Sequence, residues 1–264
     1  MAIDPRAVAD RERETWNRCA QVYADTLLPL TRQGYQLITD SGFVSRGIRL
    51  LDIGCGPGDF TRAFSDAGAL VTGVDFSPEM IRIARDRFPE VEFKVADAER
   101  LPFDDCSFDV VVGAYLAHHL ARPDVAFQEI YRVVRPGGRF VFVIPIQEAQ
   151  ASFGSFFSAV GEHYEQEAIP GGPLLLELDT AVHKSMLAAA GFSMCEIERR
   201  VVTCELESLE PLLKGGWEIG ELSSLPQPIQ AAIEATTREN AQPYWTKDRY
   251  LFPDNVFFGT ATRS

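Results

Sequence analysis

Positive charge is scarce in this sequence. Its 264 residues include 25 Lys and Arg against 38 Asp and Glu, a formal net charge of −13 at pH 7, and the basic residues form no long run. Nucleic acids and anionic membrane surfaces bind to cationic faces of proteins, so this charge balance disfavours both as partners. We therefore expect no nucleic-acid substrate.

Long hydrophobic runs are missing as well. No segment reaches the roughly 20 consecutive apolar residues that a transmembrane helix requires. The first residues, MAIDPRAVADRERETW, are polar and charged where a secretory signal would be apolar. These two features predict a cytoplasmic protein without a membrane span.

The cysteines form no recognisable pattern. Their number is odd, their spacing is wide, and none belongs to a CxxC or Cys/His arrangement that binds metal. Reduced thiols in a cytosolic protein explain them best, and we expect no metal site. The five cysteines are Cys19, Cys55, Cys106, Cys195 and Cys204.

Apolar runs typical of buried strands alternate with helical patterns between residues 48 and 144. The first run is followed by apolar residues at helical spacing over residues 60–67, and the second by the helix start Ser77-Pro78. Such alternation predicts an α/β fold with a doubly wound, mostly parallel sheet. The expected strands are Ile48–Ile53, Ala69–Val74, Val91–Val95, Phe108–Val112 and Arg139–Ile144.

A glycine-rich turn follows the first expected strand. Gly54, Gly56 and Gly58 stand between a strand and a helix, where glycine lets the backbone turn sharply and approach a ligand. Asp75 lies 21 positions after Gly54, near the roughly 20-residue offset at which an acidic residue reaches a nucleotide ribose. The alternative for Asp75 is a cap for the helix that begins at Ser77.

Asp59 bears on the choice of cofactor. A dinucleotide fingerprint would place a third glycine at this position. A carboxylate at the start of the helix would repel a pyrophosphate, which normally binds there. The pattern therefore favours a nucleoside cofactor without phosphate, such as S-adenosylmethionine, over a nicotinamide dinucleotide.

Four stretches carry a resemblance to a known family. They are LLDIGCGPGDF (50–60), VTGVDFSPEMIRIAR (71–85), VADAERLPFDDCSFDVVVGAYLAHHL (95–120) and EIYRVVRPGGRFVFV (129–143). Together they resemble the class I S-adenosylmethionine-dependent methyltransferases, in the methyltransferase type 11 group that includes ubiquinone and menaquinone biosynthesis enzymes. The resemblance implies a Rossmann-like, seven-stranded sheet of six parallel strands and one antiparallel strand.

The resemblance also implies a division of the chain into six parts. The flanking parts would form a cap over the cofactor edge, with an aromatic-lined pocket for a small organic acceptor; the alternative is that these aromatics are core. Residues 1–46 are expected to be helical, with Pro29 and Gly34 interrupting the pattern. The parts are an N-terminal cap (1–46), the cofactor-binding core (47–145), a lid insertion (146–185), a core helix and strand (186–206), a helical acceptor-pocket segment (207–250) and a closing strand (251–264). The aromatics are Phe153, Phe156, Phe157, Tyr164, Trp217, Tyr244 and Trp245.

By resemblance, the methionine and ribose parts of the cofactor lie at the first two strand ends. Gly54 and Gly56 would border the methionine, and Asp52 would orient the loop and approach the ammonium group. Asp75 would bind the ribose. Ligands of open α/β sheets bind beyond the carboxyl ends of the strands, and carboxylates there suit a cofactor with an ammonium and a sulfonium group.

The adenine end would involve the second and third strand ends. By resemblance, Phe76 and Met80 would pack on the adenine. Asp97 would accept a hydrogen bond from the adenine amino group, beside the backbone of Ala98. A loop cap is the alternative for Asp97.

At the sulfonium end, the resemblance places Ala114 and Tyr115 just past the fourth strand. Tyr23 belongs to a WxxxAxxY pattern that starts at Trp16, and in relatives such a tyrosine covers the cofactor. Helix packing is the alternative for the pattern.

His118 and His119 are the candidate catalytic residues. Histidine titrates near neutral pH and can take a proton from a phenol or hydroxyl. A structural role in the loop before Pro123 is the alternative, and we favour His119 as the base.

These observations predict a methyltransferase that acts on a small organic molecule at oxygen, nitrogen or carbon, in quinone or secondary metabolism, as a monomer or homodimer. The alternative is a protein that binds S-adenosylmethionine and uses the sulfonium for a rearrangement or without catalysis. A nicotinamide-dependent oxidoreductase is disfavoured by Asp59.

Overall fold

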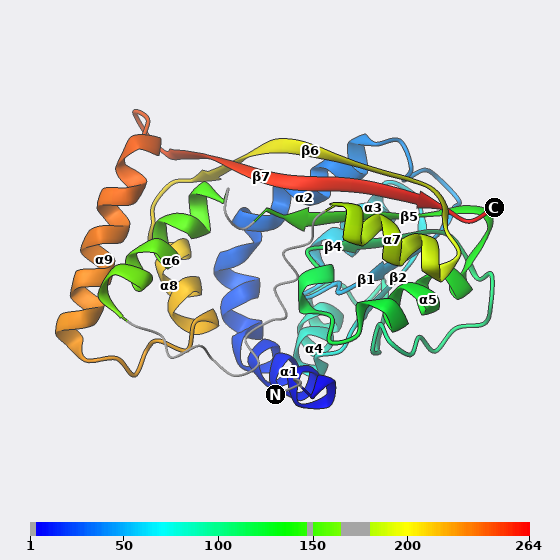
Figure 1. Cartoon of the computed structure of the whole chain (residues 1–264), viewed down its shortest axis with the longest axis horizontal. Coiled ribbons are helices and arrows are strands. Elements are labelled where there is room, and N and C mark those ends of the chain that lie inside the picture. The colour runs from blue at the N-terminus through cyan, green and yellow to red at the C-terminus, as the bar shows by residue number, and fades with distance from the viewer. Residues whose placement is uncertain (1–3, 147–149, 165–179) are drawn as a thin grey trace.

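A seven-stranded sheet forms the centre of the computed structural model, which describes residues 4–146, 150–164 and 180–264 (Figure 1). The strand order is β3-β2-β1-β4-β5-β7-β6, and β7 runs antiparallel to both of its neighbours while the other pairs are parallel. The predicted Rossmann-like fold with six parallel strands and one antiparallel strand is thereby confirmed. The strands are β1 (Arg49–Ile53), β2 (Leu70–Asp75), β3 (Glu92–Val95), β4 (Phe108–Ala114), β5 (Val134–Pro145), β6 (Ser193–Leu206) and β7 (Tyr250–Thr262).

Helices flank the sheet and form a cap beside it. The start of α4 is fixed by residues close to it in the sequence. Ser77 caps this helix by accepting a hydrogen bond from the Met80 backbone N–H at 3.1 Å, as its position before Pro78 predicts. The helices are α1 (Pro5–Val22), α2 (Leu28–Asp40), α3 (Asp59–Asp66), α4 (Pro78–Arg87), α5 (Pro123–Val133), α6 (Ala151–His163), α7 (Thr180–Ala190), α8 (Glu210–Ile219) and α9 (Gln227–Ala241). A π-helix (Tyr23–Leu27) joins α1 to α2, and 3₁₀ turns cover Ala117–His119 and Gln242–Tyr244.

Both faces of the sheet are buried at its central strands β1, β4 and β5. Side chains of β1 alternate, with Leu51 and Ile53 in a core cluster with α5 and α7, and Leu50 in a second cluster with α2 and α3. This alternation directs Asp52 to the α2 and α3 side. Strands buried on both faces read as continuous apolar runs, which is why the sequence pattern located them.

The prediction that Gly34 interrupts the N-terminal helical pattern was wrong. Gly34 lies inside α2, and a Cβ atom at this position would lie 2.5 Å from the Tyr115 hydroxyl oxygen. Glycine is therefore required by a close approach of α2 to the residue after β4, and it does not end the helix.

A helical cap stands at the far end of the long β6–β7 pair (Figure 1). There α6, α8 and α9 pack around an apolar cluster in which Phe156 is fully buried and Trp217 meets it edge-on at 5.2 Å between ring centroids. Tyr164 and Tyr244 also pack against this cluster, so most of the predicted pocket aromatics serve as core of the cap. An acceptor pocket among them stays a prediction.

Parts of the predicted lid insertion, residues 147–149 and 165–179, lie outside the described residues. Its remaining residues include α6, which belongs to the cap. Among the described residues, none of the helices combines the length and apolar character needed to cross a membrane.

Candidate cofactor site

The glycine loop after β1 has the conformation that its sequence predicts. Gly54, Gly56 and Gly58 have φ angles of +72°, +53° and +87°, a region that side chains other than glycine rarely adopt. A Cβ atom on Gly56 would lie 3.8 Å from the Tyr23 ring and 4.0 Å from the Met80 sulfur. The loop therefore turns its bare backbone toward two residues that the sequence also assigned to the cofactor.

Asp75 braces this loop from the end of β2. Its two carboxylate oxygens accept hydrogen bonds from the backbone N–H groups of Gly56, at 3.0 Å, and Ser77, at 2.9 Å. Burial raises the pKa of Asp75 to about 6, although both backbone donors act to lower it. Each carboxylate oxygen has a second lone pair that can accept a ribose hydroxyl, so the capping and cofactor roles are compatible.

Asp52 has an unsatisfied oxygen. One carboxylate oxygen accepts a hydrogen bond from the Thr61 hydroxyl at 2.6 Å, while Oδ1 is buried without a hydrogen-bond partner among the described residues. Burial raises the pKa of Asp52 to about 7, the Thr61 hydrogen bond opposes the rise, and nearby Asp75 adds to it. An unpaired buried acceptor is costly, and an ammonium group is a donor that would satisfy it.

The adenine residues predicted from the sequence lie near one another. The Arg13 guanidinium lies 5.9 Å from the centre of the Phe76 ring and 3.8 Å from an Asp97 carboxylate oxygen. Asp97 also accepts a hydrogen bond from the Glu99 backbone N–H at 2.9 Å, which is the loop cap considered above. Ala98 is buried in the core beneath, and an adenine contact by these residues stays a prediction.

Two partly buried tyrosines occupy the sulfonium end of the predicted site. Ala114 ends β4, and Tyr115 follows it with a φ of +54°, which is uncommon for a residue other than glycine and recurs at functional sites. Tyr23 begins the π-helix, and its hydroxyl lies 3.2 Å from that of Thr31. Burial raises the pKa of Tyr23 to about 12 and that of Tyr115 further still, so both hydroxyls keep their protons at neutral pH.

His118 and His119 differ in their surroundings. His119 Nδ1 lies 2.9 Å from Glu12 Oε2 on α1, and the side chain is 23 % exposed. His118 is partly buried, its buried Nδ1 has no partner among the described residues, and desolvation lowers its pKa well below the ordinary value. Only His119 combines a carboxylate partner with access to a ligand.

Helix α1 lies across the loops that follow β2, β3 and β4. Besides the contacts of Arg13 and Glu12, the Asn17 side-chain oxygen accepts hydrogen bonds from the Ser77 hydroxyl at 2.7 Å and the Glu79 backbone N–H at 3.3 Å. Sequence reasoning missed Glu12, Arg13 and Asn17. Their spacing around Trp16 places them on neighbouring turns of one helix, but charged residues on a helix usually face solvent and gave no specific signal.

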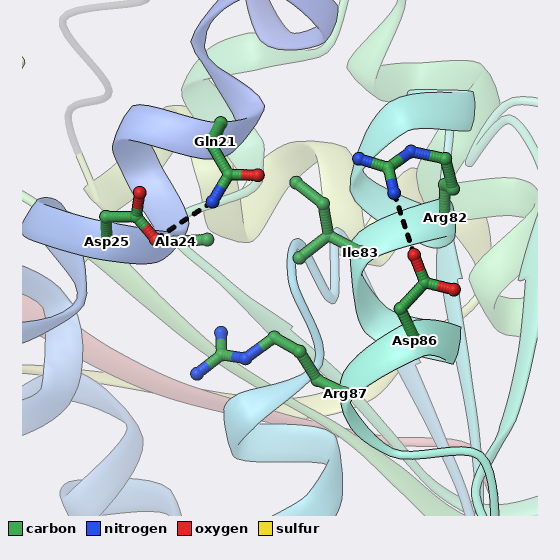
Figure 2. A pocket seen from close by; sticks show the side chains of 7 residues that line it. All are labelled: Gln21, Ala24, Asp25, Arg82, Ile83, Asp86 and Arg87. Carbon is green, nitrogen blue, oxygen red and sulfur yellow. Dashed lines mark hydrogen bonds and ion pairs between the residues drawn. The ribbon is translucent and has the colours of Figure 1, made fainter.

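A recess of about 320 Å³ opens between α4 and the segment formed by α1 and the π-helix (Figure 2). Four of its polar side chains pair with one another, Gln21 with Asp25 at 2.9 Å and Arg82 with Asp86 at 2.7 Å, and the fifth, Arg87, binds a carboxylate outside the recess. These pairs leave the recess without a group directed at a ligand, and we assign it no function. The lining residues are Gln21, Ala24, Asp25, Arg82, Ile83, Asp86 and Arg87.

Arg87 also revises the argument from Asp59. Its guanidinium binds both carboxylate oxygens of Asp59, at 2.6 and 2.8 Å, so the charge at the start of α3 is balanced. The expected repulsion of a pyrophosphate is weaker than the sequence alone implied. The choice of cofactor therefore rests on the rest of the site and on relatives.

The class of protein follows from three features: the mostly parallel sheet, the glycines with positive φ, and the two buried carboxylates at the carboxyl edge of the sheet. They define a Rossmann-like α/β protein that binds a nucleoside cofactor at this edge. A family model described as a methyltransferase domain matches residues 51–142. The chain is 34 % identical over 140 residues to demethylmenaquinone methyltransferase of Renibacterium salmoninarum, covering 53 % of this chain and 57 % of that protein. The Clavibacter sepedonicus protein of the same name is 32 % identical over 183 residues, covering 62 % and 72 %.

The YcgJ protein of Bacillus subtilis has the same fold, with a TM-score of 0.60 at 21 % identity over 87 % of this chain and 98 % of that one. The chain belongs to the class I S-adenosylmethionine-dependent methyltransferase family, in the type 11 group. This membership confirms the family predicted from the sequence. The chain spans only a little over half the length of the Renibacterium relative.

Proposed function

We propose that this protein transfers the methyl group of S-adenosylmethionine to a small organic acceptor. The observation that carries the proposal is the loop after β1. There a buried oxygen of Asp52 has no hydrogen-bond partner among the described residues, and Asp75 braces a backbone whose positive φ angles favour glycine. These groups match the ammonium and ribose hydroxyls of the cofactor. When bound, the cofactor supplies a methyl group made electrophilic by the sulfonium.

The chain's own residues orient the reactants and manage protons. Methyl transfer is an in-line displacement, and holding both reactants in line contributes much of the rate acceleration. Tyr23 and Tyr115 are partly buried at this edge and would exclude water from the reacting atoms. His119, hydrogen-bonded to Glu12, would accept a proton from an acceptor hydroxyl.

The acceptor we propose is a hydroxylated aromatic compound of the reduced quinone type. Two curated relatives are named for demethylmenaquinone methylation, and a histidine that can accept a proton suits an acceptor that arrives protonated. The net charge of −13 disfavours a polyanionic acceptor.

The test uses 1,4-dihydroxynaphthalene as the acceptor probe, with mass spectrometry of both products. We expect S-adenosylhomocysteine and a methylated probe in equal amounts. Tight binding of S-adenosylmethionine without S-adenosylhomocysteine formation across a panel of phenols, amines and carbon acids would contradict methyl transfer and favour a non-catalytic use of the sulfonium.

A further inference from the structure

Glu12 is a charged side chain in a buried position. Only 6 % of the residue is exposed, although it lies on α1 near the N-terminus of the chain. Its Oε2 atom receives the Trp16 indole N–H at 3.2 Å and lies 2.9 Å from His119 Nδ1. Burying a carboxylate is costly unless hydrogen-bond donors compensate for the lost water, so these two contacts explain how Glu12 can occupy this place.

The chemistry of the contact determines where His119 carries its proton. An ionised carboxylate accepts hydrogen bonds and donates none, and the indole nitrogen only donates. The 2.9 Å contact with Glu12 is therefore satisfied only if His119 Nδ1 carries hydrogen. In the neutral ring this leaves the lone pair on Nε2, the form that a general base requires.

We propose that Glu12 is the positioning residue for the catalytic base. Its carboxylate holds His119 with the proton on Nδ1 and the lone pair on Nε2. Because Glu12 belongs to α1, His119 has this protonation only when α1 packs against the strand ends. The proposal rests on the proposed methyl transfer and adds to it a residue outside the stretches that resemble the family.

The proton balance of the reaction agrees with this role. The acceptor O–H bond breaks and its proton passes to His119 Nε2. The electron pair that this leaves on the oxygen forms the bond to the methyl carbon, and the former C–S pair stays on sulfur. The resulting imidazolium faces Glu12 of α1 and Asp75 at the end of β2, whose charges favour it, and the neighbouring ring of His118 at 4.0 Å.

The same contacts explain why His119 and not His118 can serve as the base. The two histidines are consecutive in one 3₁₀ turn, yet Nδ1 of His118 is buried and lacks a partner among the described residues. Desolvation keeps the His118 ring neutral, so it cannot store the proton that methyl transfer releases. Glu12 thus selects which of the two rings serves as the base.

The first experiment observes the ring directly and needs no acceptor. The 264-residue chain labelled with ¹⁵N-histidine contains four histidines, and the variants H118N and H119N assign the signals of these two rings in two-bond ¹H–¹⁵N spectra. We expect the wild-type His119 ring with its proton on Nδ1, and a mixed or inverted tautomer in E12Q. A proton on Nε2 in the wild type, or an unchanged spectrum in E12Q, would overturn the proposal.

The matched control is R18A on the same helix. Arg18 forms an exposed ion pair with Glu221 of the cap at 3.0 Å, so its removal perturbs α1 without touching His119. We expect the wild-type tautomer in R18A. A tautomer change in both variants would mean that general docking of α1, and not the Glu12 carboxylate, sets the ring, which also overturns the proposal.

The second experiment measures kinetics with 1,4-dihydroxynaphthalene. E12Q should lower kcat at least about tenfold, because the wrong tautomer removes the base, with the KM for S-adenosylmethionine unchanged within about twofold. Unchanged kcat in H119N would refute His119 as the base, whereas the tautomer of the wild type and E12Q would still decide whether Glu12 holds the ring.

Discussion

Replacing Asp52 by Asn is expected to move stability and cofactor binding in opposite directions. Asp52 is fully buried, and its pKa rises from 3.8 to about 7 because of burial. The unfolded chain releases this proton near pH 4 and the folded chain near pH 7. The folded state therefore binds more protons in this window, so stability falls as the pH rises through it and levels off above about pH 7.

The magnitude follows from the shift. Three pKa units at about 1.4 kcal/mol each mean that the ionised carboxylate costs the folded state on the order of 4 kcal/mol above pH 7. Asn removes the charge and keeps an acceptor for Thr61, but its unpaired buried N–H group costs about 1–3 kcal/mol. The free energy of unfolding of D52N should therefore exceed that of the wild type by roughly 1–3 kcal/mol at pH 8. Each kcal/mol corresponds to a rise of about 2–4 °C in Tm.

Calorimetric unfolding of the ligand-free protein at pH 5 and pH 8 tests this difference. D52N should be more stable than the wild type only at pH 8, while titration with S-adenosylhomocysteine should show at least about tenfold weaker binding, because a charge-assisted contact of about 1.5–3 kcal/mol is lost. D66N, which removes an exposed carboxylate paired with Arg62, serves as the control. A D52N protein that is less stable at both pH values, or one with unchanged affinity, would refute the reasoning.

Three further predictions concern the same edge of the sheet. D75A should weaken S-adenosylhomocysteine binding at least about tenfold in calorimetry, because it removes a charged hydrogen-bond partner; unchanged affinity in a folded variant would exclude Asp75 from the ribose site. G56V should abolish the thermal stabilisation by the ligand, since valine is strained at a φ of +53° and its side chain would extend toward Tyr23; retained stabilisation would make the loop only a turn. Limited proteolysis should show slower cleavage around α1 when S-adenosylhomocysteine and an acceptor analogue are both present; equal rates in a protein that is cleaved without ligand would argue against a ligand-gated cap.

The fold was predictable because its signals are local. The apolar run of β1 and the pair Ser77-Pro78 report burial and helix capping within a few residues, and these local patterns survive in the structure. The glycine loop was equally predictable, since positive φ angles favour glycine and the sequence has Gly54 and Gly56 at these positions.

Contacts between distant residues left no comparable trace. Gly34 resembled a helix breaker because the side chain that requires a glycine there, Tyr115, lies far along the chain. Glu12 resembled an ordinary surface charge because its partner His119 is 107 positions away. Asp59 resembled an uncompensated carboxylate because Arg87 comes from the next helix. The parts of the site that depend on how α1, α3 and α4 pack were therefore beyond reach of the sequence patterns.

The π-helix between α1 and α2 sets the rotational phase of the N-terminal helix. A π-turn accommodates one residue more than an α-turn, and each residue of an α-helix advances the side-chain direction by about 100°. Removing one residue from Tyr23–Leu27 would convert the segment to a plain α-helix and turn α1 by about that angle relative to α2. Glu12 and Trp16 would then face away from the strand ends, while α2 would still pack against the sheet. A single residue in this joint thus decides whether the N-terminal helix presents its polar face to the carboxyl edge.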